Sequence, residues 1–477
     1  MTTSAVLAID QGTSGTKAVV VDAEDGILGV AERVVSPRYL PGGGVEQDPT
    51  ELLDSVLDAG RAALAQAGRP VQAVSLANQG ETVLAWHRAT GRPIGAAIGW
   101  QDRRAESVVV GMADAAEWVA HRTGLVLDPY FSAPKMAWLR RNVTGEGVVT
   151  TTDTWLIHQL CSAFVTDVAT ASRSLLTDLD TGDWNDELRA LFGWADEAVP
   201  DIVDCDHAVG TTRAFGDELP VAGLIVDQQA ALLAEACLSP GYAKCTFGTG
   251  AFLLANTGGR AVRSAAGLSA SVAWRLRDQI SYCLDGQVYT AASAVRWLSD
   301  LGIIAGAEDL DRLAAADPGA VLCVPALAGL GAPWWRADAT AALTGLTLSS
   351  GRGEVILAVL QGIAAQIAEL AAAARADGVA LDRLRVDGGL VQCRTLMQAT
   401  ADLVQVPLEV YPSAHATALG AAALGRLAMT PSLSVADAVP AWTPSHTYEP
   451  RWSPERAEEF RADWRRAVSR AVPERTS

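Results

Sequence analysis

The chain has 477 residues, 49% hydrophobic and 19% charged, which excludes a mainly disordered protein and suggests about two or three domains. Acidic side chains outnumber basic ones by 55 to 37, so the formal net charge is −18 and the surface should repel nucleic acid and anionic membranes. The 7 cysteines and 6 histidines lack metal-binding spacing, which predicts reduced thiols and no structural zinc.

The amino terminus and the apolar segments favour a cytoplasmic protein. The first residues contain no basic segment and no cleavage-like site, so we expect no signal peptide. The longest apolar stretch, near residues 321–335, is interrupted by proline and glycine and is too short to span a bilayer. We therefore expect neither nucleic acid nor a membrane among the partners of this protein.

The first elements along the chain form a predicted antiparallel unit. Residues 6–9 are apolar and predict a buried strand that ends at Asp10. A turn rich in glycine and hydroxyl groups follows, and residues 16–22 predict the returning strand. Asp25 and Gly26 then mark a second hairpin turn before a third strand at residues 27–36.

The later elements alternate between helices and strands. Apolar periodicity predicts helices at 49–68, 155–161, 228–237 and 354–375, with another from about 395, and strands at 71–78, 219–226, 243–247, 251–256 and 384–386. The strand–turn–strand pattern at 243–256 repeats that of the opening, which indicates an α/β protein with two domains of related build. The helix at 354–375 contains many small residues and suits a close seam between the domains.

The glycine turns at the strand ends suggest a nucleotide site. Backbone N–H groups can converge on phosphate where glycine permits close approach, and the turns at 12–15 and 248–250 offer such groups together with hydroxyls. Asp10 adds a carboxylate, which suits Mg²⁺. A Walker-type loop, a dinucleotide fingerprint and a nucleophile elbow are all absent from the sequence. Each glycine turn alone is typical of an ordinary hairpin, but together with Asp10 they predict nucleotide binding across a cleft.

Ordered motifs along most of the chain resemble those of the FGGY family of carbohydrate kinases, with the greatest similarity to its glycerol kinase branch. These motifs occur at residues 8–14, 44–49, 78–82, 100–104, 130–135, 153–156, 227–231, 247–250, 331–335 and 385–389. The resemblance implies two ribonuclease H-like domains of the actin, hexokinase and Hsp70 ATPase superfamily flanking a catalytic cleft. We place the N-terminal domain at 1–238 and the C-terminal domain at 239–477.

The resemblance also implies a reaction. The enzyme would use ATP and Mg²⁺ to phosphorylate a hydroxyl of a small polyol or sugar, and it would assemble as a homo-oligomer, a dimer or tetramer. Transfer to an alcohol requires a group that accepts the hydroxyl proton, and Asp227 matches the family's catalytic aspartate. An aspartate at this place in the chain also suits a helix N-cap, and the two interpretations are compatible.

The remaining site residues are carried over from the family motifs. Asp10 and Asp227 are predicted to hold the metal. The substrate-binding set is Gly80, Glu81, Trp100, Asp102, Tyr130, Asp227, Gln228 and Phe252. The cofactor-binding set is Gln11, Gly12, Thr13, Ser14, Lys17, Gly248, Thr249, Gly388, Gly389 and Cys393. For Trp100 and Tyr130 an ordinary core position is the competing interpretation.

Two positions depart from the family pattern. Cys393 stands where the family often has an asparagine, which puts the hydrogen bond to the nucleotide base in doubt. Gly80 stands where glycerol kinases have an arginine, whose rigid fork of donors can hold adjacent hydroxyls. Either glycerol binds with a substitute donor such as Arg103, or the site takes a larger polyol or ketose, and we favour the second.

Two alternative functions follow from the same residues. Within the family, the alternative is a pentulose or tetrose/tetritol kinase, acting on xylulose, ribulose, erythritol or erythrulose. Xylulokinases tend to have a Met-His pair in the loop that here contains Gln79, Gly80 and Glu81, which argues against that branch. An ATP-switching scaffold on the same fold is the alternative from another class, and the Asp227–Gln228 pair argues against it.

Overall fold

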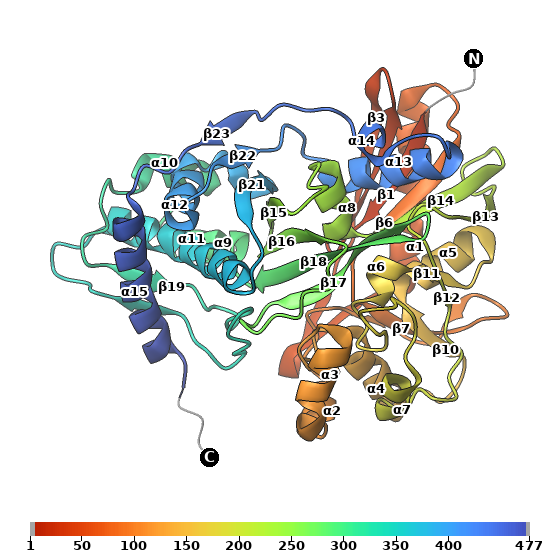
Figure 1. The fold of residues 1–477 in the computed structure, drawn as a ribbon, viewed down its shortest axis with the longest axis horizontal. Helices are drawn as coiled ribbons and strands as arrows, with labels where there is room; N and C mark the ends of the chain where they lie inside the picture. Colours follow the sequence, from red (N-terminus) through yellow and green to blue (C-terminus); the bar gives the residue numbers. More distant parts are fainter. Residues whose placement is uncertain (1–4, 474–477) are drawn as a thin grey trace.

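Two mixed β-sheets, each covered by helices, organise the molecule (Figure 1). The computed structural model describes residues 5–473. Residues 1–4, on which the expectation of no signal peptide partly depends, lie outside the described part.

The first sheet is built from the N-terminal half of the chain. Its spatial order is β13 (Ala208–Thr212), β14 (Leu219–Val226), β6 (Ala73–Asn78), β1 (Val6–Gln11), β2 (Gly15–Asp22) and β3 (Gly26–Val34). The first three strands of the chain pair antiparallel, as predicted, whereas β6 runs parallel to both β1 and β14. Helix α1 (Pro49–Ala67) packs on β1–β3 and is capped by Asp48, whose side chain accepts the N–H of Thr50.

The second sheet repeats this arrangement in the C-terminal half. Its order is β17 (Ser269–Leu276), β18 (Gln279–Val288), β16 (Ala251–Gly258), β15 (Gly241–Phe247), β21 (Leu381–Asp387), β22 (Leu408–Val410) and β23 (His446–Tyr448). Strands β18, β16, β15, β21 and β22 have the same order and directions as β3, β2, β1, β6 and β14. The prediction of two α/β halves of related build is therefore confirmed.

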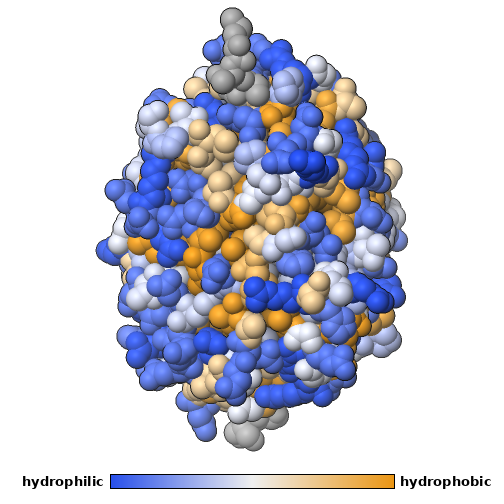
Figure 2. All heavy atoms as spheres, turned by 90° about the vertical axis from the view of Figure 1, so that its right-hand side faces the viewer, coloured by the Kyte–Doolittle hydropathy of each residue, from blue (hydrophilic) through white to orange (hydrophobic). Residues whose placement is uncertain are grey.

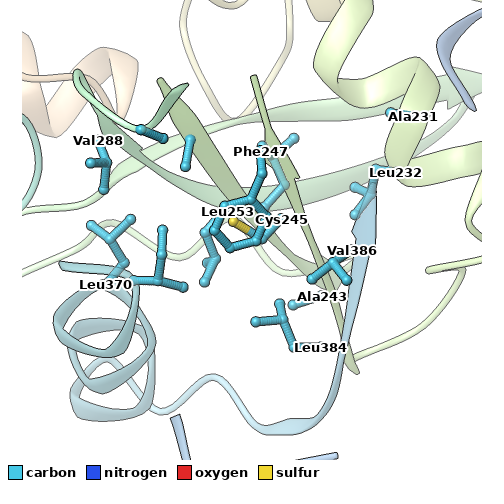
Figure 3. Close-up of a cluster of buried hydrophobic side chains, with 14 of the residues drawn as sticks. Ala231, Leu232, Ala243, Cys245, Phe247, Leu253, Val288, Leu370, Leu384 and Val386 are labelled. Atoms are coloured by element: carbon cyan, nitrogen blue, oxygen red, sulfur yellow. The ribbon is translucent and has the colours of Figure 1, made fainter. Parts of the chain in front are cut away.

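Side chains that alternate along β15 point either into the apolar core or toward the cleft. Figure 3 shows Ala243, Cys245 and Phe247 of β15 gathered with Leu384 and Val386 of β21 in one apolar cluster. Because successive side chains of a strand point to opposite faces, Lys244 and Thr246 lie on the other face of β15.

A smaller sheet and several helices extend the N-terminal half. This sheet has the order β10 (Val148–Thr151), β7 (Val83–His87), β9 (Ala97–Ile98), β5 (Gly44–Gln47) and β4 (Arg38–Leu40), with β8 (Arg92–Pro93) on β7. The helices of this region are α2 (Glu106–Val110), α3 (Ala116–Thr123), α4 (Ser132–Asn142), α5 (Thr152–Cys161), α6 (Val168–Ala171) and α7 (Asp186–Leu191), beside the two-stranded sheet of β11 (Val165–Asp167) and β12 (Asp201–Val203). The C-terminal half adds α9 (Ala292–Asp300), α10 (Leu310–Leu313), α12 (Arg394–Val404), α14 (Val435–Ala438), α15 (Pro454–Ala471) and the sheet of β19 (Leu322–Val324) with β20 (Ala342–Thr344).

The predicted seam helix does not lie between the halves. Helix α11 (Arg352–Ala376) packs against α12, β16, β18 and β19, all within the C-terminal half. Its length and apolar composition would suit a membrane span, but 83% of its most apolar window is buried inside the protein, as in a core helix. The prediction from its small residues was wrong because they serve packing inside one half.

Helix α13 (Ala416–Met429) is one of the elements that connect the halves, together with the packing of α6 on β17. It follows the second sheet in the chain but packs against β1, β6, β14 and α8 (Asp227–Ala234). A Cβ atom at Gly420 would lie 2.0 Å from the carbonyl oxygen of Ala230, so the two helices approach more closely than a side chain allows. Helix α8 is also shorter than predicted, since Ala236 has φ 55° and the chain turns there.

One face of the molecule is mainly hydrophilic (Figure 2). Figure 2, which shows the side on the right of Figure 1, has hydrophilic residues over most of this face with smaller hydrophobic patches between them. The apolar side chains therefore pack mainly inside the molecule.

Candidate active site

A cavity of about 250 Å³ lies between the two halves of the molecule. It is lined by Thr13, Ser14, Tyr39, Gln79, Gly80, Glu81, Trp100, Gln101, Tyr130, Arg173, Val226, Asp227, Gln228, Thr246, Gly248, Thr249, Gly250, Phe252 and Asp285. Most of the residues predicted to bind substrate and phosphate are in this lining, although they come from segments far apart in the sequence.

The strand directions explain why these segments meet. Strands β1, β6 and β14 are parallel, and their carboxyl ends lie at the same edge of the first sheet. The residues that follow these strands include Thr13, Gln79 and Asp227, so they enter the cavity together.

The second half contributes the hairpin turn between β15 and β16. This turn holds Gly248 and Thr249 in the cavity lining. Gly388, after β21, has φ 96°, and a Cβ atom there would lie 2.4 Å from the carbonyl oxygen of Phe247. The turn that contains Gly388 lies directly against the start of the turn at 248–250, and only glycine fits such a close approach.

Asp227 begins helix α8 and faces the cavity. Its Oδ1 accepts the backbone N–H of Gln228 at 2.7 Å, while Val226 occupies the N-cap position. The interpretation of Asp227 as the helix N-cap is therefore wrong. Burial raises the pKa of the Asp227 carboxyl, and the positive charge of Lys244 opposes this shift. The Nζ of Lys244 donates to Gln228 Oε1 at 2.6 Å, which steadies the residue next to Asp227.

Asp10 and Asp227 form an acidic pair near the cavity. Burial raises the pKa of Asp10 to about 7, and the charge of Asp227 adds to the shift. A carboxylate whose pKa is raised by a neighbouring carboxylate favours a bound cation. Within residues 5–473 no group of three His, Cys, Asp or Glu side chains could hold a metal. Two carboxylates nevertheless fit Mg²⁺, which keeps several waters and takes phosphate oxygens as further ligands.

Arg173 and Asp285 are cavity residues to which the sequence motifs gave no role. The Arg173 guanidinium donates from Nε to Glu81 and from Nη1 to Asp285 Oδ2 at 2.5 Å. The exposed fractions of these side chains are only 5% for Arg173, 4% for Glu81 and 8% for Asp285, so this is a buried ion network. Glu81 itself has φ 60°, a strained conformation for a residue other than glycine. The network joins the N-terminal half to β18 of the C-terminal half.

Aromatic rings form one wall of the cavity. Trp100 packs edge-on against Tyr130 at 5.6 Å and against Phe252 at 5.9 Å, measured between ring centroids. The Trp100 Nε1–H donates to Thr13 Oγ1 at 2.9 Å. The wall therefore combines residues from both halves with the first glycine turn.

Gly80 leaves less free space than expected. A Cβ atom at Gly80 would lie 3.0 Å from Cγ2 of Val226, so a valine methyl group already fills the direction of the missing side chain. Arg103, the expected substitute donor, pairs with Asp128 at 2.8 Å and with Glu106 at 2.6 Å and is absent from the cavity lining formed by the described residues. Among the described residues of the lining, Arg173 and not Arg103 supplies the guanidinium.

Several predicted residues lie near the cavity but do not line it. Asp102 is fully buried and accepts the N–H of Val45 at 2.6 Å and the Arg104 guanidinium, which is a structural arrangement. The Gln11 side chain is also buried, and its Oε1 accepts from Asn78 at 2.7 Å. The Gly12 N–H closes the first turn on the carbonyl of Gly15.

A second cavity of about 890 Å³ lies beyond the end of β21. Gly388 and Asp387 line it, together with Tyr411 and Ser413 after β22. The Nζ of Lys17 donates to the carbonyl of Ala414 at 3.4 Å.

Gly389 and Cys393 are close in sequence to residues that line the second cavity, but neither of them lines it. The Cys393 Sγ lies 3.5 Å from Asp311 Oδ1, so the thiol is engaged within the protein. The roles of Gly388, Gly389 and Cys393 beside the adenosine stay predictions.

Lys135 fixes the loop that places Tyr130 in the cavity. Its buried Nζ donates to the carbonyls of Pro129 at 3.0 Å, Tyr130 and Phe131 at 2.7 Å. Lys135→Met should lower the free energy of unfolding by about 3 kcal/mol because it leaves these carbonyls unpaired. Urea unfolding measures this, with Arg141→Met on the exposed face of the same helix as control. If both variants had the same free energy of unfolding, Lys135 would not hold the loop.

Comparison with known protein families gives two matches along the chain. The N-terminal domain of the FGGY family of carbohydrate kinases matches residues 5–234. The C-terminal domain of the same family matches residues 243–429.

Individual relatives cover nearly the whole chain. The glycerol kinase of Alkalilimnicola ehrlichii is 42% identical and that of Aromatoleum aromaticum is 40% identical, and the alignments cover at least 98% of each chain. The crystal structure of Plasmodium falciparum glycerol kinase with ADP superimposes with a TM-score of 0.90 at 30% identity, covering 98% of both chains. The xylulose kinase of Rhodospirillum rubrum has a TM-score of 0.86 at 22% identity, a likeness that concerns the fold alone.

Proposed function

Since the chain belongs to the FGGY family of carbohydrate kinases, we propose that Asp227 is the general base of a phosphoryl transfer from ATP to a polyol or sugar. Membership makes the protein a carbohydrate kinase, similar to glycerol kinase, that transfers phosphate to an alcohol group. The observation that supports the role of Asp227 is its position: the carboxylate lines a cavity shared by both glycine turns and a polar acceptor pocket.

The geometry around Asp227 suits proton transfer. The N–H of Gln228 holds one carboxylate oxygen, which leaves the other oxygen for an acceptor hydroxyl. As the hydroxyl attacks the terminal phosphorus of ATP, its proton moves to this carboxylate and the bond to the ADP oxygen breaks. Lys244 contributes positive charge, which favours the ionised form of Asp227 that can accept the proton.

The two glycine turns are proposed to hold the phosphates. Thr13 and Ser14 from the first turn, and Gly248 and Thr249 from the second, supply hydroxyl and backbone N–H groups that face the same cavity. Asp10 and Asp227 would hold Mg²⁺, which when bound neutralises charge on the phosphate oxygens. Because each turn belongs to a different half, ATP binding would also favour closure of the halves and exclusion of water.

The acceptor pocket is proposed to use the residues predicted from the sequence. Glu81 and Gln228 offer polar groups for hydroxyls, while Trp100, Tyr130 and Phe252 form an apolar wall for the carbon chain. Gly80 provides no side-chain donor for adjacent hydroxyls. A second candidate acceptor is therefore a four- or five-carbon polyol or ketose, which this position favours over glycerol.

A screen of acceptors tests the proposed function. ATP consumption should rise at least about 10²-fold when a suitable polyol or ketose is added to the enzyme with Mg²⁺, because the reaction requires an acceptor hydroxyl. The panel comprises glycerol, tetritols, pentitols and pentuloses, with the enzyme lacking acceptor as control. ATP binding without stimulation by any of these compounds would favour the ATP-switching scaffold instead.

We also propose a cytoplasmic location and a homo-oligomeric assembly. The location is supported by the 7 free cysteines of the chain and by its acidic composition. The assembly, a dimer or tetramer, rests on the family resemblance.

A further inference from the structure

The cavity contains three oxygen atoms whose hydrogen-bonding capacity is unused within residues 5–473. They are Gln79 Oε1, Gln101 Oε1 and Asp285 Oδ1, and each is buried from solvent. Counted over the whole residue, Gln79 and Asp285 are only 2% and 5% exposed. Other buried polar atoms within residues 5–473 also have no partner in the protein, but these three belong to side chains that line one cavity, where a ligand can supply the donors.

The orientation of the Gln79 and Asp285 oxygens follows from their neighbours. The Nε2 of Gln79 donates to Gln47 Oε1 at 2.9 Å, so the opposite atom of the amide, Oε1, is the one left over. Arg173 binds Asp285 through Oδ2, which leaves Oδ1 of the same carboxylate. All three unused atoms can only accept hydrogen bonds, so they require a ligand with several donors.

The charge of the cavity limits the ligand further. Its lining contains the carboxylates of Glu81, Asp227 and Asp285, and Arg173 is the one basic side chain among the described residues of the lining. Arg173 is already bound to Glu81 and Asp285, so its guanidinium is not available as a free cation for an acidic group. An anionic acceptor would therefore meet three carboxylates and no free cation within the lining, while the charges of Lys135 and Lys244 behind it already act on these carboxylates.

On the basis of the proposed kinase function, we propose that the acceptor is an uncharged polyol of at least four carbons whose outer hydroxyls donate to Gln79, Gln101 and Asp285. One hydroxyl faces Asp227 and reacts, and three more match the three unused oxygens. A three-carbon polyol has too few hydroxyls for this set. In the free enzyme, water satisfies the same oxygens and is displaced by the acceptor. Asp285 and Gln101 are thus specificity-determining residues outside the predicted substrate set.

The first test compares acceptors on the wild-type enzyme. The value of kcat/KM should be at least about 10-fold higher for a tetritol or pentitol than for glycerol, because each unmatched buried oxygen weakens binding. The four-carbon aldonic acid, which differs from the tetritol by one carboxylate, should show no turnover. A large preference for glycerol would overturn this inference while leaving the proposed kinase function intact.

The second test uses matched variants. Gln101→Met should lower kcat/KM for the preferred polyol about 10-fold and leave glycerol within about 2-fold, since the hydroxyl proposed to donate to Gln101 is one that glycerol lacks. Gln279→Met, at the exposed start of β18, is the control and should change neither value. An equal loss for all acceptors would identify Gln101 as structural and overturn the inference.

Asp285→Asn separates charge from hydrogen bonding. It keeps the size of the side chain but removes its charge, so the aldonic acid should gain measurable turnover while the polyol loses activity. Thermal unfolding checks that the variant is folded, and Gln101→Met carries the test if it is not. Activity with none of the acceptors would contradict the proposed function itself, a result distinct from a glycerol preference.

Discussion

Asp227→Asn is expected to fold like the wild-type chain and to lower turnover about 10²–10⁴-fold. An asparagine can still accept the N–H of Gln228, so the start of helix α8 should be unchanged. It cannot accept a proton from the acceptor hydroxyl at neutral pH, so the reaction loses its base. The measurement is kcat with saturating ATP and acceptor, together with the thermal unfolding temperature.

Asp201→Asn is the matched control for this prediction. Asp201 is exposed at the start of β12 and absent from the cavity lining formed by the described residues, so its amide should leave kcat unchanged. Near-normal turnover of Asp227→Asn would remove Asp227 from the mechanism. Loss of folding would instead assign this side chain a structural role.

Arg173→Met is expected to have the largest effect on stability. The substitution leaves the carboxylates of Glu81 and Asp285 buried without their shared partner, which costs about 3–5 kcal/mol in comparable cases. Arg69→Met is the control, because its ion pair with Asp25 is exposed and should contribute at most about 0.5 kcal/mol. Urea unfolding of both variants gives the comparison, and a loss below about 1 kcal/mol for Arg173→Met would contradict the account.

The pH dependence of this loss has a defined sign. Burial raises the pKa values of Glu81 and Asp285, and Arg173 opposes the shift in the wild-type protein. Without Arg173 both pKa values rise further above those of the unfolded chain, so the folded variant binds more protons than the unfolded one. Its stability should therefore increase as the pH falls toward these pKa values, and the deficit should be smaller at pH 5 than at pH 8. Adding Glu81→Gln and Asp285→Asn should remove this dependence.

Much of the fold follows from local patterns. The apolar strand that ends at Asp10 and the glycine turns at 12–15 and 248–250 predicted the paired strand–turn–strand units that begin the two sheets. Helix α1 was also predicted to within one residue, because apolar periodicity runs from Pro49 and Gly68 marks its end. Sequence patterns of a few residues are enough to predict strands, turns and helix ends that depend on residues nearby in the chain.

Other features depend on contacts that local patterns do not record. Arg173 and Asp285 are 112 residues apart and meet only because α6 packs against β17, the neighbour of β18, in the other half. The small residues of α11 and α13 look alike in sequence, but α11 packs within the C-terminal half, whereas α13 packs on the first sheet. The methyl group of Val226 fills the space beside Gly80, which an interpretation of the Gly80 loop alone could not reveal.

The most direct test is a crystal structure with Mg²⁺, a non-hydrolysable ATP analogue and a polyol acceptor. The account predicts that the triphosphate lies between the two glycine turns, facing Asp10, Gly12 and Gly248, with the metal at Asp10 and Asp227. The acceptor hydroxyl should lie within hydrogen-bond distance of Asp227 and in line with the terminal phosphorus. A triphosphate bound elsewhere, or an acceptor far from Asp227, would contradict the account.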